Sequence, residues 1–291
     1  MYKVERLPAP LPTYRLKDLA AGSEAEVVPG RGGMAARFRV GDFPVLAMDD
    51  TTLYDEAKNV RGGIPILFPV AGRLAGDRYD RPGKTDACLM KQHGFARNMV
   101  WDVLSEGTDG AARLTVVLSS SEATRSQFPF DFRLEYTYEL AGPTLRLLQS
   151  YENRSPQPMP LHAGFHPYFY VPDAEKAKTV VQTRATWAFN NVAKTKIPFT
   201  EFDLTQKEVD LHLIDHGGSE SVLTRPGRGG RIEIVASPEF GHWVVWTLGG
   251  KDFVCVEPWT APGNALNTGD RLIWLSPGET KFLTLAITAS S

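Results

Sequence analysis

The nine residues FRLEYTYEL at positions 132–140 alternate strictly between apolar and polar side chains. A period of two places every second side chain on the same face of an extended chain, so one face can pack in a core while the other meets water. The pattern therefore predicts a half-buried β-strand. Its inward face would carry the apolar members, Phe132, Leu134, Tyr136, Tyr138 and Leu140.

Comparable short runs recur along the chain: RLTVVLSS, TLRLLQSYEN, RIEIVAS, WVVWTL, FVCVEPW, RLIWL and KFLTLAIT. Many of them are bounded by turn-forming residues, as strands are. Only SEATRSQF (121–128) and DAEKAKTV (173–180) predict a helical turn or two. Many short strands with few helices favour an all-β fold, a large antiparallel β-sandwich or barrel, over alternating strands and helices.

The composition is that of an ordinary soluble globular protein: 42% of the 291 residues are hydrophobic, 23% are charged, and the net charge is −2. This balance gives no electrostatic reason to expect binding to nucleic acid or to an anionic membrane. No apolar run approaches the ~18 residues that a membrane span needs. The first residues lack the apolar segment of a signal peptide, so we expect a cytoplasmic protein. Gly and Pro are scattered and mark no linker, so we expect one domain over residues 1–291.

The stretch LHAGFHPYFYVPD (161–173) carries two histidines four residues apart. A helical zinc motif is disfavoured because prolines and a glycine interrupt any helix and no glutamate follows His162. On an extended strand, His162 and His166 would share a face and could look into one cleft, or either could be a buried core histidine. We favour packing for His162. The aromatic residues around His166 could form the walls that a sugar ring needs.

The stretch FVCVEPWTAPGNALNTG (253–269) places a carboxylate at the end of an apolar strand. Val254 and Val256 share one face, so Cys255 and Glu257 share the other. Glu257 either caps a turn or is partly desolvated, which would raise its pKa towards a value suited to a general base. Cys255 is interpreted as a small core residue, and with Cys88 it makes only two cysteines, too few for a disulfide framework or a cysteine zinc site.

Two further stretches offer cationic and polar donors. RGGIPILFPVAGRL (61–74) has Arg61 and Arg73 around an apolar segment, and its two glycines permit a close backbone approach. KQHGFARNMVW (91–101) places His93 and Arg97 around a glycine and a phenylalanine. Each stretch alone is also compatible with a turn and a solvated arginine.

Taken in this order, the four stretches resemble the aldose 1-epimerase (galactose mutarotase-like) family over about residues 20–287. RGGIPILFP followed by QHGFAR is most similar to the hexose-6-phosphate mutarotase branch. The resemblance implies a galactose mutarotase-like β-supersandwich. It also implies that His166 is the acid that protonates the ring oxygen and Glu257 the base that deprotonates the anomeric hydroxyl.

The resemblance further implies the substrate-binding residues. His93 would orient the sugar, Arg61 and Arg97 would lie near a sugar phosphate, and Arg73 in AGRL matches a sugar-contacting arginine of plain aldose mutarotases. The family's acidic sugar-binding residue corresponds to either Asp210 or Asp215, of which Asp210 is preferred. Free sugar and sugar phosphate therefore both remain as substrates, and the sequence does not predict the oligomeric state.

The expected chemistry is interconversion of α and β anomers, which opens and closes a hemiacetal by acid–base catalysis. It requires no metal and no organic cofactor. We expect the carboxylate of Glu257 to favour protonated His166, and His166 to keep Glu257 ionised. The alternative is a non-catalytic carbohydrate-binding β-sandwich module. A glycoside hydrolase is disfavoured because it needs two carboxylates across the scissile bond and only one motif supplies one.

Overall fold

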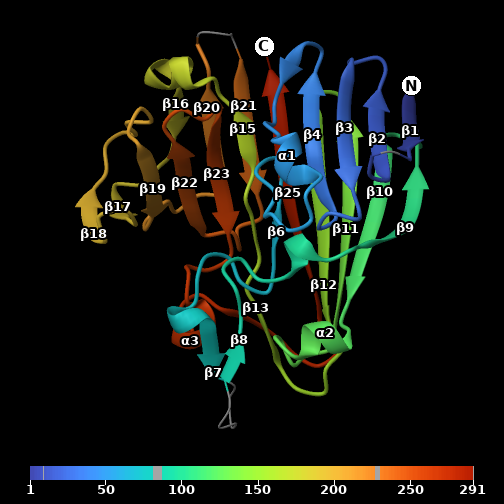
Figure 1. The fold of residues 1–291 in the computed structure, drawn as a ribbon, viewed down its shortest axis with the longest axis vertical. Helices are drawn as coiled ribbons and strands as arrows, with labels where there is room; N and C mark the ends of the chain where they lie inside the picture. The colour runs from blue at the N-terminus through green and yellow to red at the C-terminus, as the bar shows by residue number, and fades with distance from the viewer. Residues whose placement is uncertain (9, 81–86, 227–229, 291) are drawn as a thin grey trace.

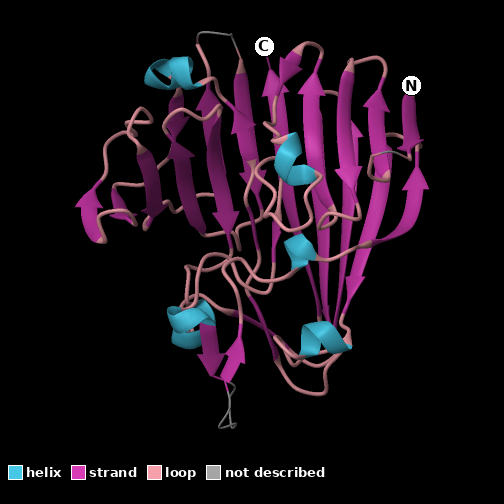
Figure 2. Ribbon diagram, in the orientation of Figure 1, coloured by secondary structure: helices cyan, strands magenta, loops and turns pink. Residues whose placement is uncertain are grey.

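The computed structural model describes residues 1–8, 10–80, 87–226 and 230–290. Nearly all of the regular structure is antiparallel β-sheet, stacked in two layers that Figures 1 and 2 show from the same side. The helices are short; α2 and α3 lie at one end of the molecule, and α1 lies in front of the central strands. The expected all-β fold class, a large antiparallel β-sandwich with few short helices, is confirmed.

One layer is a single sheet that runs behind the other in Figure 1. Its eight strands are, in spatial order, β16 (Val180–Gln182), β20 (Glu220–Thr224), β21 (Arg231–Ala236), β25 (Thr280–Ser290), β12 (Thr144–Asn153), β11 (Phe132–Ala141), β10 (Ala112–Ser119) and β9 (Asp102–Gly107).

The facing layer consists of two sheets. The first contains β1 (Tyr2–Leu7), β2 (Thr13–Asp18), β3 (Ser23–Val28), β4 (Met34–Val40) and β5 (Phe43–Pro44). The second contains β18 (Thr195–Pro198), β17 (Trp187–Asn190), β19 (Glu208–Leu213), β22 (His242–Leu248), β23 (Phe253–Trp259), β14 (Gly164–Phe165) and β6 (Ile66–Leu67), with β15 (Tyr168–Tyr170) also paired to β23. Isolated bridges, Leu46 to Phe169 and Ala35 to Ile64, join the two sheets.

The remaining elements are small. Two small two-stranded sheets pair β7 (Arg78–Asp80) with β8 (Ala87–Leu89) and β13 (Met159–Leu161) with β24 (Ile273–Leu275). The helices are α1 (Asp50–Leu53), α2 (Glu122–Arg125), α3 (Ala265–Thr268) and the 3₁₀ helices η1 (Ala75–Asp77), η2 (Ala96–Asn98) and η3 (Asp173–Lys178). Both predicted helical segments contain such turns, α2 and η3.

The alternating stretch at 132–140 forms β11, in which buried and half-buried residues alternate throughout. Its inward side chains join the core between the layers, where Phe132 and Phe68 have ring centroids 5.2 Å apart. Strand β23 shows the same division, because Val254 and Val256 belong to this core while their neighbours face the other way. The face of the second sheet that points away from the core is therefore free to build a site.

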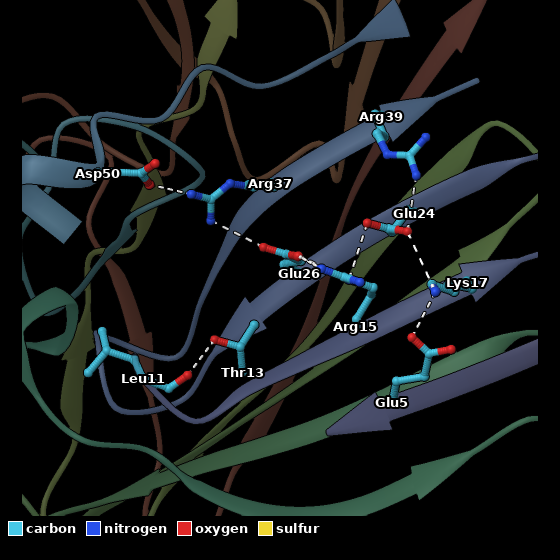
Figure 3. A network of polar contacts seen from close by, with 10 residues as sticks. All are labelled: Glu5, Leu11, Thr13, Arg15, Lys17, Glu24, Glu26, Arg37, Arg39 and Asp50. Atoms are coloured by element: carbon cyan, nitrogen blue, oxygen red, sulfur yellow. Dashed lines mark hydrogen bonds and ion pairs between the residues drawn. The ribbon is translucent and has the colours of Figure 1, made fainter. Parts of the chain in front are cut away.

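A ladder of charged side chains covers the five-stranded sheet (Figure 3). Glu26, only 8% exposed, pairs with Arg15 at 2.7 Å and with Arg37 at 3.1 Å. Lys17 on β2 pairs with Glu5 on β1 at 2.7 Å and with Glu24 on β3 at 3.9 Å. Cross-strand pairs of opposite charge stabilise sheet register, so this surface is explained by structure alone.

The close approach expected at the RGG stretch is present at Gly63, whose φ is +63°. A Cβ there would lie 2.4 Å from the carbonyl oxygen of Ala35, which is backbone and cannot move aside. Gly41 also has a positive φ, +54°, but open space around it. We expect Gly41→Ala to cost about 1 kcal/mol from the left-handed backbone alone and Gly63→Ala about 1–3 kcal/mol more from the clash. Urea denaturation of the two variants measures the difference, and equal costs would show that the approach is not tight.

Candidate active site

A cavity of about 890 Å³ opens on the outward face of the sheet that contains β19, β22 and β23. Loops from the first half of the chain, at 59–61, 72–75 and 92–97, form its other wall. All seven residues that the sequence assigned to catalysis or substrate binding line this cavity: Arg61, Arg73, His93, Arg97, His166, Asp210 and Glu257.

Strand pairing places His166 opposite Glu257. Strand β14 pairs with β23 at Gly164 and Trp259, and β15 pairs with it at Tyr168 and Cys255, so the turn that holds His166 lies beside Glu257. Nε2 of His166 lies 3.3 Å from Oε1 of Glu257. The indole N–H of Trp259 donates to the other carboxylate oxygen of Glu257 at 3.2 Å. An imidazole and a carboxylate thus meet at the cavity wall, both almost fully buried.

Burial dominates the protonation of this pair. It lowers the pKa of His166 to about 3, with repulsion from Arg97 and Arg61 adding to the shift. It raises the pKa of Glu257 well above its ordinary value, with Asp210 adding to that shift. The raised pKa of Glu257 agrees with the expected desolvation, and it contradicts the expectation that His166 keeps Glu257 ionised. The expectation that Glu257 would favour protonated His166 is wrong, because the loss of hydration outweighs the attraction between the partners.

His93 is held as a neutral hydrogen-bond donor. The backbone N–H of Gly72 donates to Nδ1 of His93 at 3.1 Å, which leaves the proton of the neutral ring on Nε2. Burial lowers the pKa of His93 well below its ordinary value, and electrostatic repulsion from His166 lowers it further. The two imidazole rings are 5.5 Å apart in an edge-to-face arrangement. Nε2 of His93 lies 3.2 Å from the side-chain amide nitrogen of Gln92, so a bound hydroxyl that accepts from Nε2 would replace this contact and meet an uncharged ring.

The three arginines differ in how they are held. The guanidinium of Arg61 lies over the Trp246 ring, 5.4 Å from its centroid. Arg97 donates to the carbonyl oxygen of Gln92 at 3.0 Å, and its Nε is buried with no hydrogen-bond partner among the described residues. Burial lowers the pKa of Arg97 from its ordinary value. Arg73 lies at the rim, with 68% of its side chain exposed and an ion pair to Asp77 at 3.4 Å.

The two aspartates considered from sequence occupy different places. Asp210 lines the cavity, where its carboxylate accepts a hydrogen bond from Asn191 at 2.7 Å. Asp215 does not line it, and its carboxylate accepts from the backbone N–H groups of Thr186 and Trp187 at 3.0 and 2.9 Å. Asp215 caps a turn, and Asp210 is the aspartate available to a ligand.

Comparisons with known proteins identify the family of this chain. The sequence model of the family described as aldose 1-epimerase matches residues 19–288. The chain belongs to the aldose 1-epimerase family. Its members are isomerases that bind sugars as substrates.

Relatives of this family member include the Slr1438 protein of Synechocystis, whose crystal structure has a TM-score of 0.94 and 36% identity over 100% of this chain and 99% of its own. The LacX protein of Lactococcus lactis is 27% identical over 77% of this chain and 82% of its own length. A Salmonella typhimurium protein provisionally named glucose-6-phosphate 1-epimerase is 31% identical, over 48% of this chain and 42% of its own.

The sequence analysis missed two histidines in the cavity of this aldose 1-epimerase family member. Nε2 of His212 lies 3.3 Å from Asp210, and Nδ1 of His212 lies 2.9 Å from Nε2 of His242. Because His212 donates to the carboxylate through Nε2, His242 must be the donor between the two rings. The i, i+2 spacing of Asp210 and His212 on one strand could have indicated His212. Nothing local indicates His242, which comes from the neighbouring strand β22.

His162 does not line the cavity. It is fully buried, and its Nε2 lies 2.9 Å from the carbonyl oxygen of Ala261. Burial lowers its pKa to about 4. The interpretation of His162 as a packing residue agrees with this position.

Among the described residues, no helix is long and apolar enough to cross a membrane.

Proposed function

We propose that this chain interconverts the α and β anomers of an aldohexose, with a hexose 6-phosphate as the favoured substrate. The observation that carries the proposal is the 3.3 Å approach of His166 Nε2 to Glu257 Oε1 at the wall of a cavity of about 890 Å³. A non-catalytic sugar-binding module needs aromatic walls and amides but has no use for a buried acid–base pair. The pair therefore favours the isomerase.

In the proposed reaction, Glu257 takes the proton of the anomeric hydroxyl while His166 delivers one to the ring oxygen. The ring opens, the C1–C2 bond rotates, and the reverse transfers close it on the other face. Each positioned acid or base typically contributes about 10²–10⁴ to the rate. His93 would donate to a sugar hydroxyl, and Asp210 would accept from others.

Burial of His166 and Glu257 has two effects on the proposed proton transfers. Ring opening starts from protonated His166 and ionised Glu257 and leaves both neutral. Burial makes this ion-pair form the minor form of the empty site. Burial shifts the pKa values of His166 and Glu257 in the two directions that favour the neutral pair. From the ion pair, the water-poor wall therefore favours ring opening. Forming the ion pair from the neutral pair costs free energy first.

Arg61 and Arg97 support a phosphorylated substrate. A guanidinium presents forked N–H donors that match phosphate oxygens, and the Nε of Arg97 lacks a protein partner among the described residues. The relative provisionally named glucose-6-phosphate 1-epimerase agrees with this choice. Saturation-transfer NMR on glucose 6-phosphate, glucose and galactose tests the proposal. We expect accelerated anomer exchange, greatest for glucose 6-phosphate, and no acceleration on any of the three would contradict it.

Replacing Arg61 with alanine should separate phosphate recognition from sugar recognition. A hydrogen bond to a charged group contributes about 1.5–3 kcal/mol, so we expect the KM for glucose 6-phosphate to rise by about ten- to a hundredfold. The KM for glucose should change by less than about threefold. Exchange rates measured over a range of concentrations give both constants.

The matched control is Arg39→Ala, because Arg39 pairs with Glu24 on the five-stranded sheet and does not line the cavity. Its kinetics should equal those of the wild type. An equal rise of both KM values in Arg61→Ala would show that Arg61 does not bind phosphate.

A further inference from the structure

Cys255 takes no part in the proposed acid–base chemistry, yet it lies beside the pair that does. It occupies β23 two residues before Glu257, so the two side chains emerge on the same face of the strand. The cysteine is free and fully buried. Strand β15 pairs Tyr168 directly with Cys255, which brings the turn containing His166 over the same place.

Three good metal ligands therefore converge. One ring nitrogen of His166, the Sγ of Cys255 and one carboxylate oxygen of Glu257 all lie within 4.8 Å of one another. His166 is not saturated by hydrogen bonds, because its Nδ1 is buried and has no partner among the described residues. The cluster thus combines a thiol, a carboxylate and an imidazole with an uncommitted nitrogen.

We propose that His166, Cys255 and Glu257 form a binding site for one thiophilic divalent cation of the Zn²⁺ or Cd²⁺ type, which blocks the cavity when it binds. Zinc bonds of about 2.0–2.3 Å in a tetrahedron separate the ligand atoms by roughly 3.3–3.8 Å. The observed spread of up to 4.8 Å must therefore close by about 1 Å. Rotation of the His166 and Glu257 side chains can supply this movement, because both border the cavity. The fourth position would be open to a water molecule or a substrate hydroxyl.

The charges around the cluster are compatible with a cation. A bound divalent ion with thiolate and carboxylate ligands makes a neutral unit, which a buried site tolerates far better than an isolated charge. The positive charges of Arg61 and Arg97 would repel a bound cation, and the negative charge of Asp210 would attract it. A soft thiolate ligand selects Zn²⁺ and Cd²⁺ over Mg²⁺ and Ca²⁺, which prefer oxygen ligands.

Titration of the purified, reduced protein with Cd²⁺ tests the site without reference to activity. A cadmium–thiolate bond produces an ultraviolet charge-transfer band, which we expect to saturate at one ion per chain. Cys255→Ala should abolish the band, and Cys255→Ser repeats the test with a side chain closer to the original volume. Circular dichroism confirms that both variants are folded. Cys88→Ala is the matched control, because Cys88 lies on the separate β7–β8 hairpin; it should bind Cd²⁺ as the wild type does.

The other two ligands have their own expected result. Glu257→Gln and His166→Gln should retain the charge-transfer band but bind Cd²⁺ at least tenfold more weakly than the wild type. Mg²⁺ should not compete with Cd²⁺ for the site in any of these proteins. In the wild type, Zn²⁺ should inhibit anomer exchange, and in Cys255→Ala the inhibition should weaken at least tenfold. A band that persists without Cys255, or disappears without Cys88, would overturn the proposal. Cadmium binding without any anomer exchange would overturn the proposed function alone and leave the metal site standing.

Discussion

Glu257→Gln is expected to slow anomer exchange by about 10²–10⁴-fold while the protein remains folded. The amide has the shape of the carboxylate and can still meet His166 and Trp259, but it cannot take a proton from the anomeric hydroxyl. Saturation-transfer NMR at saturating substrate measures the loss in kcat. Because a general base acts only in the transition state, kcat should fall much more than KM changes.

The same variant carries an expected gain in stability. Burial raises the pKa of Glu257 above its unfolded value, so its contribution to folding is fully present below that unfolded value and is lost as the pH rises through the folded one. Glutamine has no such loss. The melting temperature of Glu257→Gln relative to the wild type should therefore increase between pH 5 and pH 8.

Glu208→Gln is the matched control, because Glu208 also lines the cavity but bonds the indole of Trp246 at 3.2 Å instead of His166. It should retain near-wild-type kcat. Near-wild-type exchange by Glu257→Gln itself would mean that Glu257 is not the base.

His166→Gln is expected to reduce kcat by a similar factor, about 10²–10⁴, because it removes the proposed proton donor that lies beside Glu257. The glutamine keeps a polar side chain of comparable length against Tyr168, on which the imidazole stacks with centroids 4.7 Å apart. Exchange NMR again measures the rate. Substrate binding, measured by titration calorimetry, should survive.

The control for this variant is His216→Gln. His216 stacks on Trp243 with centroids 4.8 Å apart and does not line the cavity. Its replacement should cost stability and leave kcat unchanged. A loss of kcat in His216→Gln as large as that in His166→Gln would trace both losses to damaged folding.

The strands could be predicted because alternation is a local property. The stretch at 132–140 places its inward residues without reference to any partner, and β11 follows it nearly residue for residue. The division of β23 into a core face and a Glu257 face followed from the same rule. The order of strands in the sheets did not follow, because it depends on pairings between distant segments such as β12 and β25.

The site shows the same limit. The sequence supplied the residues of the cavity through a family resemblance, but the approach of His166 to Glu257 comes from two separate pairings of β23. His242 was missed because only the register of β22 with β19 brings it to His212. The prediction that His166 is protonated was wrong. The sequence shows a carboxylate nearby, but it does not show how deeply the imidazole is buried, and burial opposes its charge.

The most direct test of the central claim, that His166 and Glu257 act as one proton-sharing unit in anomer exchange, is a double-mutant cycle. The exchange rate of glucose 6-phosphate is measured for the wild type, Glu257→Gln, His166→Gln and the double variant. Groups that act as a unit are strongly non-additive, so the double variant should be no slower than the slower single variant. Losses that multiply, giving a double variant slower by the product of the two factors, would contradict the claim.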